Sequence, residues 1–281
     1  SVFVPDLGKN AFLRRLFRRM GRFRPVLREI NSLLSGRKPP SFSGWLMTTW
    51  HHLPWEDGWE EFRQAAEDVR SFEHTHSGGM RPEKGNDPGR TVDALLWRHW
   101  NVAYSVHHAF RHTGCSDFLA VECGVADGMT ANFAAAQGVA ECSEFFSLHL
   151  YDSWSTMRED GLTTSEGGMD GRYGALSQNL TRRNLYKYGP NLFWHPGYIP
   201  ETLDDSAPET VSWLHIDLNS AKTTMLVLDF FYPRIRPGGV VLFDDYGWDG
   251  NTEMRITVDD WFREKTGTLF PLPTGQAIYF N

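Results

Sequence analysis

The sequence predicts a doubly wound α/β fold built on a mostly parallel, seven-stranded sheet. Short, nearly continuous apolar runs recur along the second half of the chain, and helical segments lie between several of them. Strands that are apolar on both faces are typical of a parallel sheet covered by helices on each side. The chain ends in two strand-like runs around a Thr-Gly turn, which predicts an antiparallel hairpin at the sheet edge.

The strands can be placed in order along the chain. Helical spacing is present in 91–110, with Thr91 as a plausible N-cap, and helices are also expected in 129–139 and 221–235. In an open α/β sheet, ligands bind beyond the carboxyl ends of the strands, so the residues that end the apolar runs are the candidate site. The five candidate parallel strands are 117–123, 145–152, 191–197, 211–217 and 239–245, and the closing hairpin is 268–281.

The N-terminal part differs from the rest, and we expect two domains: a helical arm with a contact segment at 1–90 and the main domain at 91–281. The stretch 10–23 has helical spacing, with an apolar stripe opposite its arginines. Such a helix docks on its own domain or on a second copy, which would make a homo-oligomer, or it lies on an anionic membrane surface. We favour docking. The stripe consists of Phe12, Leu13, Leu16, Phe17 and Met20.

Charge and composition exclude several classes of protein. Residues 1–40 hold ten basic and two acidic residues, whereas the remaining chain holds 18 basic and 33 acidic residues. The acidic main part is not expected to bind nucleic acid. No apolar run approaches the roughly 20 residues that a membrane span needs. Cys115, Cys123 and Cys142 are odd in number and form no CxxC pair, which predicts reduced thiols and a cytoplasmic location.

Glycines and an acid follow the first two strands. After 117–123, the stretch "VECGVADGMT" contains Glu122 and a Gly124–Gly128 turn that opens a helix. Glycine there lets a ligand approach the backbone, although an ordinary strand-to-helix turn would use glycine as well. The second strand ends at Asp152, before Ser153, and an acid in this place suits the two hydroxyls of a ribose or serves as a solvated cap.

Three further acids end the fourth and fifth strands. His215 and Asp217 are two residues apart and therefore point to the same face of their strand, and Asp244 and Asp245 follow the fifth strand. Three unpaired carboxylates in a partly dry crevice would repel one another. A hard divalent cation with oxygen ligands removes that repulsion, and magnesium suits a site with few carboxylates. The sequence therefore predicts a Mg²⁺ site.

Residues 117–281 resemble the class I S-adenosylmethionine-dependent methyltransferases, and more narrowly the macrocin, mycinamicin and novobiocin type of sugar O-methyltransferase. The stretches that carry the resemblance are "FLAVECGVADGMT", "LYDSW", "HPGYIPETL", "LHIDLNSAKTTMLVLDFFYPRIRPGGVVLFDDYGW" and "TVDDWFREKTGTLFPLPTGQAIYF". The family commonly has a second acid two residues after the first, where this chain has Asn219.

The resemblance implies S-adenosyl-L-methionine as the methyl donor and a role for most of the residues above. Glu122 and the Gly124–Gly128 turn would meet its methionine part. Asp152, with Ser153 beside it, would bind its ribose, and Gly197 and Tyr198 would lie near the adenine. The same resemblance assigns Asp217, Asp244 and Asp245 to magnesium.

The implied reaction is Mg²⁺-dependent methylation of a hydroxyl on a small molecule, most simply a sugar or a glycosylated natural product. Asp217 would be a ligand and the base, with His215 as the rival base. The polar stretch 153–180 is long enough to be a lid over the site. The alternatives are a catechol-type phenolic O-methyltransferase, an NAD(P)-dependent oxidoreductase, which would normally show G-x-G-x-x-G, and a non-catalytic binding module.

Overall fold

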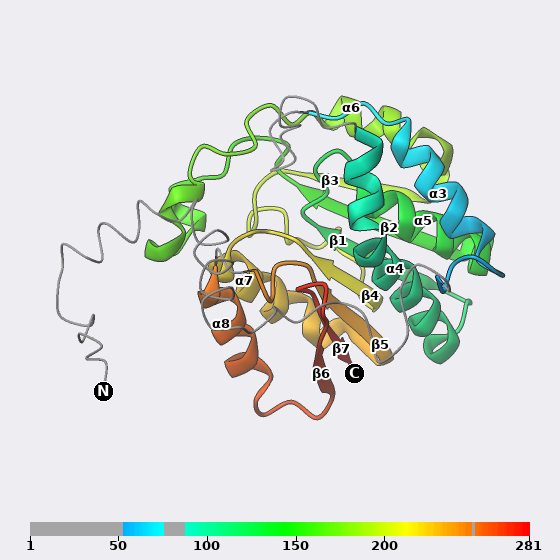
Figure 1. Cartoon of the computed structure of the whole chain (residues 1–281). Helices are drawn as coiled ribbons and strands as arrows, with labels where there is room; N and C mark the ends of the chain where they lie inside the picture. Colours follow the sequence, from blue (N-terminus) through cyan, green and yellow to red (C-terminus); the bar gives the residue numbers. More distant parts are fainter. Residues whose placement is uncertain (1–52, 76–87, 249–250) are drawn as a thin grey trace, which may run out of the picture. The chain divides into compact units, whose positions relative to one another are not determined.

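The computed structural model describes residues 53–75, 88–248 and 251–281. A compact unit runs from Pro54 to Asn281 and contains the whole sheet (Figure 1). Within the described residues, two helices precede the sheet, α3 (Glu60–Arg70) and α4 (Pro88–Thr113). The amphipathic helix expected at 10–23 lies outside the described residues, and the domain boundary at residue 90 stays a prediction.

The sheet has the predicted architecture. Its seven strands lie in the order β3-β2-β1-β4-β5-β7-β6. The first five strands in this order are parallel to one another, β7 is antiparallel to β5, and β6 is antiparallel to β7. The doubly wound α/β fold with an antiparallel closing hairpin is therefore confirmed. The strands are β1 (Phe118–Cys123), β2 (Phe146–Asp152), β3 (Leu192–Pro196), β4 (Val211–Ile216), β5 (Ile235–Phe243), β6 (Thr268–Pro271) and β7 (Ala277–Phe280).

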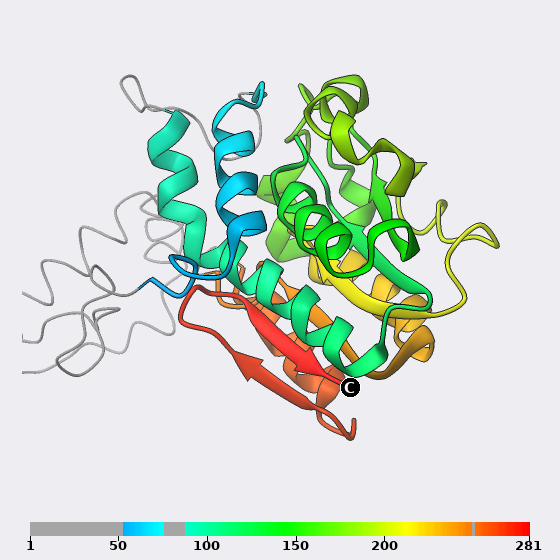
Figure 2. The same ribbon diagram turned by 90° about the vertical axis from the view of Figure 1, so that its right-hand side faces the viewer.

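Helices cover both faces of the sheet, as its apolar strands require. Figures 1 and 2 show α4 and α5 on one face and α7 and α8 on the other, and α3 packs against α4 and α5. The helix α3 was not predicted, although its buried residues, Phe62, Ala65, Ala66 and Val69, have the spacing of an amphipathic helix. The remaining helices are α5 (Met129–Cys142), α6 (Gln178–Asn184), α7 (Ala221–Phe231) and α8 (Thr252–Phe262), with 3₁₀ turns at Ser143–Phe145, Glu159–Gly161, Thr164–Met169, Tyr186–Asn191 and Tyr232–Arg234.

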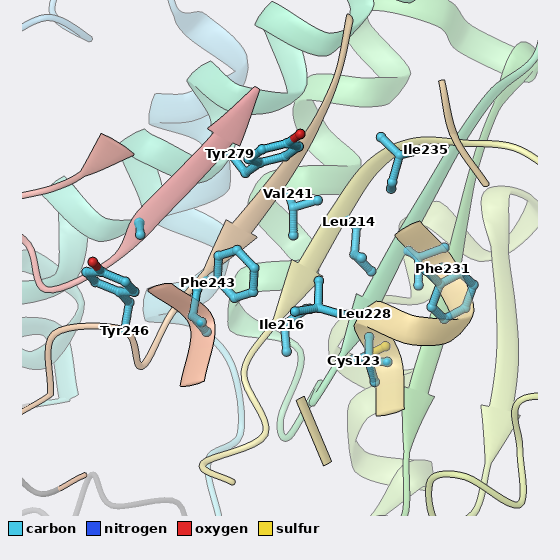
Figure 3. Packing of buried hydrophobic residues seen from close by; sticks show 14 of the residues in the cluster. Cys123, Leu214, Ile216, Leu228, Phe231, Ile235, Val241, Phe243, Tyr246 and Tyr279 are labelled. Carbon is cyan, nitrogen blue, oxygen red and sulfur yellow. The ribbon is translucent and has the colours of Figure 1, made fainter. Parts of the chain in front are cut away.

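Strand alternation decides which side chains can reach the site. Leu214 and Val241 point toward α7 and pack in the core around Leu228 (Figure 3). Trp213 is one residue away from Leu214 and therefore points to the opposite face, where its Nε1 donates to Ser105 Oγ of α4 at 2.8 Å. Alternate residues of a strand point to the same face. The polar side chain two residues after Trp213, that of His215, therefore also points toward α4.

The cysteines correct one prediction. Cys115 and Cys142 form a disulfide with their Cα atoms 5.4 Å apart, and only Cys123 of the three is free, buried in the core. The expectation of three reduced thiols is therefore wrong for two of them. The pairing joins the segment before β1 to the end of α5, 27 residues later, so sequence spacing gave no sign of it. The cytoplasmic location stays a prediction.

Membrane spanning was tested on the part of the chain that the structure describes. None of the helices there combines the length and the apolar character that crossing a bilayer requires.

Candidate functional site

A cavity of about 680 Å³ lies beyond the carboxyl ends of the parallel strands. This is where the topology of an open α/β sheet places a ligand, and the volume is in the range of small-molecule sites. Segments after β1, β2, β4 and β5 line it together with α4 and the stretch after Asp152. Among the lining residues are Gly124, Asp152, Ser153, Gly197, Tyr198, Asp217, Asp244 and Asp245, all predicted, and Arg98, His99, Tyr173 and Trp248, which were not.

The glycine turn after β1 serves the packing of two strand ends. Gly124 has φ +90°, and a Cβ there would lie 1.9 Å from the carbonyl oxygen of Asp217. Glycine is therefore required because the end of β4 crosses directly over the turn, and the cavity beside the turn is a second consequence. Gly128, at φ +89°, is the N-cap of α5.

Asp152 holds this turn in shape. Its Oδ2 accepts the backbone N–H groups of Val125 and Ala126 at 2.7 and 2.8 Å, and its Oδ1 accepts the N–H of Trp154 at 2.6 Å. A carboxylate has about four lone-pair positions, so Asp152 can accept one more hydrogen bond from a ligand in the cavity. The hydroxyl of Tyr198 donates to Thr156 O at 2.8 Å, which ties the segment after β3 to the stretch after Asp152.

The three acids predicted to bind a metal come together. Asp217, Asp244 and Asp245 each offer one oxygen, and these oxygens all lie within 4.8 Å of one another. The backbone N–H of Asp217 donates to Cys123 O at 2.9 Å and that of Asp244 to Ile216 O at 3.0 Å, so the parallel ladder continues into the site. Asn219, at φ +54°, turns its N–H toward Asp245 Oδ2 at 2.9 Å. The acids are thus placed by the strands themselves.

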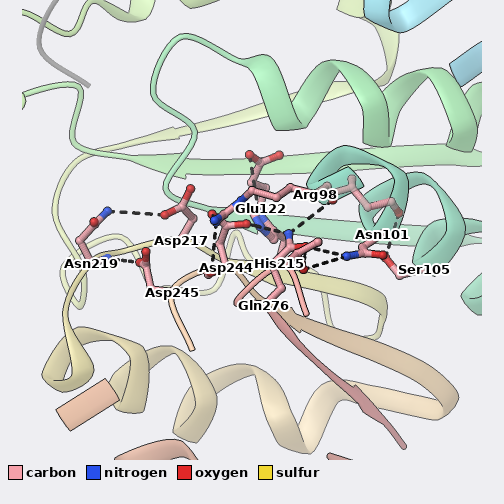
Figure 4. Close-up of polar contacts among 12 residues, drawn as sticks. Arg98, Asn101, Ser105, Glu122, His215, Asp217, Asn219, Asp244, Asp245 and Gln276 are labelled. Atoms are coloured by element: carbon pink, nitrogen blue, oxygen red, sulfur yellow. Dashed lines mark hydrogen bonds and ion pairs between the residues drawn. The ribbon is translucent and has the colours of Figure 1, made fainter. Parts of the chain in front are cut away.

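Asp244 differs from the other two acids in its partners (Figure 4). Arg98 of α4 forms an ion pair with its Oδ2, and Gln276 Nε2 donates to its Oδ1 at 2.7 Å. Burial alone would raise the pKa of Asp244, but His215, Arg98 and Gln276 hold that pKa below its usual range. Asp244 is therefore an ionised acid with neighbouring donors on both oxygens.

Asp217 and Asp245 have the opposite electrostatics. Burial first and then the charge of Asp244 raise the pKa of Asp217 well above its usual range. The same two causes raise the pKa of Asp245 to about 6. Because both shifts come from desolvation and like charge, a cation among the three acids would reverse them. This donor set of carboxylate oxygens fits a hard divalent ion.

Two predicted residues lie behind the cavity. Glu122 and His215 are fully buried, stand opposite each other on β1 and β4, and do not line the cavity. His215 Nδ1 is 3.8 Å from Glu122 Oε1, and its Nε2 is 3.8 Å from Asp244 Oδ1. Burial lowers the pKa of His215, but the two carboxylates outweigh it and raise that pKa to about 10. His215 is thus a fully buried side chain between two acids and does not line the cavity.

The stretch after Asp152, residues 153–180, lines the cavity, and the hydrogen bonds of Glu166 anchor its middle part. Glu166 is buried and its carboxylate accepts three donors: Thr163 N–H at 2.9 Å, Ala221 N–H at 2.7 Å and Asn251 Nδ2 at 2.6 Å. Ala221 begins α7 and Asn251 caps α8, so a negative charge lies at two helix N-termini. Tyr173 of this stretch lines the cavity, and burial followed by the charge of Asp217 raises its pKa to about 12.

Comparisons with known proteins agree with this geometry. Residues 121–246 match the family described as methyltransferase domain. Residues 121–246 therefore form a methyltransferase domain. The methyltransferase is 26% identical over 200 residues to mycinamicin III 3''-O-methyltransferase from Micromonospora griseorubida, which covers 66% of this chain and 70% of that protein.

Solved structures share the fold of this methyltransferase. The O-methyltransferase NovP matches with a TM-score of 0.62 at 19% identity, over 78% of this chain and 97% of that one. The calicheamicin methyltransferase CalS11 matches with a TM-score of 0.55 at 16% identity, over 85% of this chain and 99% of that one. The predicted resemblance to this group of methyltransferases is confirmed.

Proposed function

We propose that this methyltransferase transfers the methyl group of S-adenosyl-L-methionine to a hydroxyl of a small molecule, a sugar or a glycosylated natural product, with Mg²⁺ held by Asp217, Asp244 and Asp245. The observation that carries the proposal is the convergence of these three acids, within 4.8 Å of one another, at a cavity that also contains the glycine turn after β1. The mycinamicin III enzyme, a 3''-O-methyltransferase by name, supports a hydroxyl as acceptor.

The residues around the cavity suit the methyl donor. Asp152 retains a free acceptor position for a ribose hydroxyl, and Gly197 and Tyr198 line the same part of the cavity. We leave Glu122 out of this set because its side chain is fully buried and does not line the cavity. The donor, when bound, supplies a methyl group on a positively charged sulfur, which is a good leaving group. The chain mainly has to align this group with the acceptor oxygen.

The acceptor hydroxyl must lose its proton, and Asp217 is the group placed to take it. It lines the cavity beside the other two acids, so an acceptor hydroxyl in the cavity can approach its carboxylate. Magnesium, when bound, would lower the pKa of a coordinated hydroxyl. His215 is the rival base from the sequence, and its burial argues against contact with an acceptor. We propose instead that His215 balances the charges of Glu122 and Asp244.

Calorimetry with the purified protein tests the cofactor. We expect S-adenosyl-L-methionine to bind, and NAD(H) not to bind, each measured with and without Mg²⁺. Binding of NAD(H) without any response to S-adenosyl-L-methionine would overturn the proposal in favour of an oxidoreductase.

Turnover tests the acceptor and the base. We expect Asp217→Asn to reduce kcat by about a thousandfold, the middle of the range for loss of a general base, while S-adenosyl-L-methionine binds as before. Asp204→Asn, an exposed acid after β3, is the matched control and should keep full activity. Turnover of glycosides is compared with turnover of catechols, which separates sugar acceptors from phenolic ones. The phenolic alternative is included because the exposed ring of Trp248 lines the cavity.

A further inference from the structure

The three acids of the site are not equivalent, because one of them already has a cation. Arg98 Nη2 forms an ion pair with Asp244 Oδ2 and also donates to the main-chain oxygen of Asp244 at 3.1 Å. Within the described part of the chain, no Lys, Arg or His nitrogen lies within 4.0 Å of Asp217 or Asp245. The guanidinium therefore neutralises one particular acid of the three.

Arg98 is held in this place by the helix it comes from. The helix α4 packs against β5, the strand that ends at Asp244. One turn further along α4, Asn101 Nδ2 donates to Gln276 Oε1 at 2.8 Å, and Gln276 Nε2 donates to Asp244 Oδ1 at 2.7 Å. Figure 4 shows Arg98 of α4 and Gln276 of the closing hairpin in contact with Asp244. Both oxygens of Asp244 thus have donors that α4 provides or orients.

A metal ion and this guanidinium need the same acid. Oxygen ligands lie about 2.0 to 2.6 Å from Mg²⁺ or a similar ion, so an ion shared by the three acids would be only a few ångströms from Arg98. Arg98 lines the cavity, and its side chain is 30% exposed, so it has space to move away from Asp244. Two positive charges at that distance in a partly buried site oppose each other strongly.

We propose that Arg98 is an internal competitor of the divalent cation: it occupies Asp244 when the cation is absent and weakens cation binding by its charge. This inference rests on the proposed function, since it needs the three acids to bind a metal. Its consequence is that Arg98 sets the concentration of free cation at which the site fills.

Binding of Mn²⁺, followed by the loss of the electron paramagnetic resonance signal of the free ion, tests the inference without any turnover. We expect Arg98→Met to bind Mn²⁺ at least about tenfold more tightly than the wild type, because it removes one positive charge beside the acids. Arg98→Lys keeps the charge and should bind within about threefold of the wild type.

Two controls make the result specific. Arg111→Met removes the same charge from the exposed last turn of α4 and should leave the affinity unchanged. Asp245→Asn should abolish binding, which shows that the ion measured is at this site. If Arg98→Met does not fold by circular dichroism, Arg98→Gln takes its place, since its amide can still donate to Asp244 without a charge.

The outcomes separate the two proposals. If Asp245→Asn abolishes binding but the neutral Arg98 variants bind Mn²⁺ no more tightly than the wild type, Arg98 is a structural partner of Asp244 and the competition is refuted, while the metal site stands. If Arg98→Lys binds as tightly as Arg98→Met, charge is not the cause. If no variant binds Mn²⁺, the magnesium site itself is refuted, and the competition with it.

Discussion

Two buried histidines on the same sheet have opposite charge states. His215 of β4 and His149 of β2 are 0% and 8% exposed, and burial lowers the pKa of both. His215 nevertheless has its pKa raised to about 10, because the carboxylates of Asp244 and Glu122 flank it. His149 has another histidine as neighbour, with Nδ1 3.0 Å from His195 Nε2, and its pKa falls to about 4.

The comparison teaches that burial keeps a histidine of this sheet neutral unless carboxylates flank it. A charged group inside a protein is tolerated only when opposite charges replace its hydration. His215 has such charges, and it is therefore part of the electrostatic balance of the site although it does not line the cavity. His149, at the edge near β3, has an aromatic partner, Phe193, stacked at 4.9 Å, and stays neutral.

The largest expected difference between the two histidines is in stability. His215→Gln leaves Glu122 buried without a positive neighbour, and breaking a buried ion pair in this way costs about 3–5 kcal/mol. His149→Gln loses one hydrogen bond and a stacking contact and should cost about 1–2 kcal/mol. Urea denaturation at pH 7 measures both free energies of unfolding. Equal losses for the two variants would show that the flanking carboxylates contribute nothing particular to His215.

The sequence was sufficient for the fold and for the acids that the strands place. Alternating apolar runs predicted all seven strands, and the position of Asp217, Asp244 and Asp245 at strand ends predicted their convergence, because parallel strands end at one edge. The cofactor-binding role of Glu122 stays a prediction, and its side chain does not line the cavity. Residues that end a strand reach the cavity, whereas Glu122 is still within β1 and its side chain is covered.

Residues that come from distant elements could not be predicted. Arg98 is one of several arginines in the sequence, and only the packing of α4 on β5 directs it to Asp244. Gln276 belongs to the closing hairpin, and its side chain meets Asp244 because β7 pairs with β5. Both contacts depend on tertiary packing, which no local pattern of residues encodes.

The second prediction asks whether the cation site in the cavity is independent of the region around His149. Mg²⁺ at one hundred times its dissociation constant should raise the free energy of unfolding of the wild type by about 2.7 kcal/mol, since it binds only the folded state. Asp245→Asn should lose this stabilisation. His149→Gln should keep it in full, because His149 has no contact with the acids.

Thermal denaturation with and without Mg²⁺ provides the measurement, and Ca²⁺ at the same concentration shows how selective the site is. Stabilisation that survives in Asp245→Asn would place the ion elsewhere. A loss of the effect in His149→Gln would mean that the two regions are coupled through the sheet, contrary to the comparison.

The smallest effect concerns the pH dependence that His149 gives to stability. In the unfolded chain its pKa is near 6.5, whereas in the folded protein it is about 4, so between these values the unfolded state binds more protons. Stability contributed by neutral His149 is therefore complete above pH 6.5 and is lost as the pH falls toward 4.

His149→Phe keeps an aromatic ring beside Phe193 and removes the titration. From pH 7 to pH 5 the wild type should lose about 2 kcal/mol more than this variant, measured by urea denaturation. Between pH 8 and pH 7 the two should change alike, because His149 is neutral in both states there; an unchanged difference at pH 5 would mean that His149 takes up its proton as easily in the folded protein as in the unfolded chain.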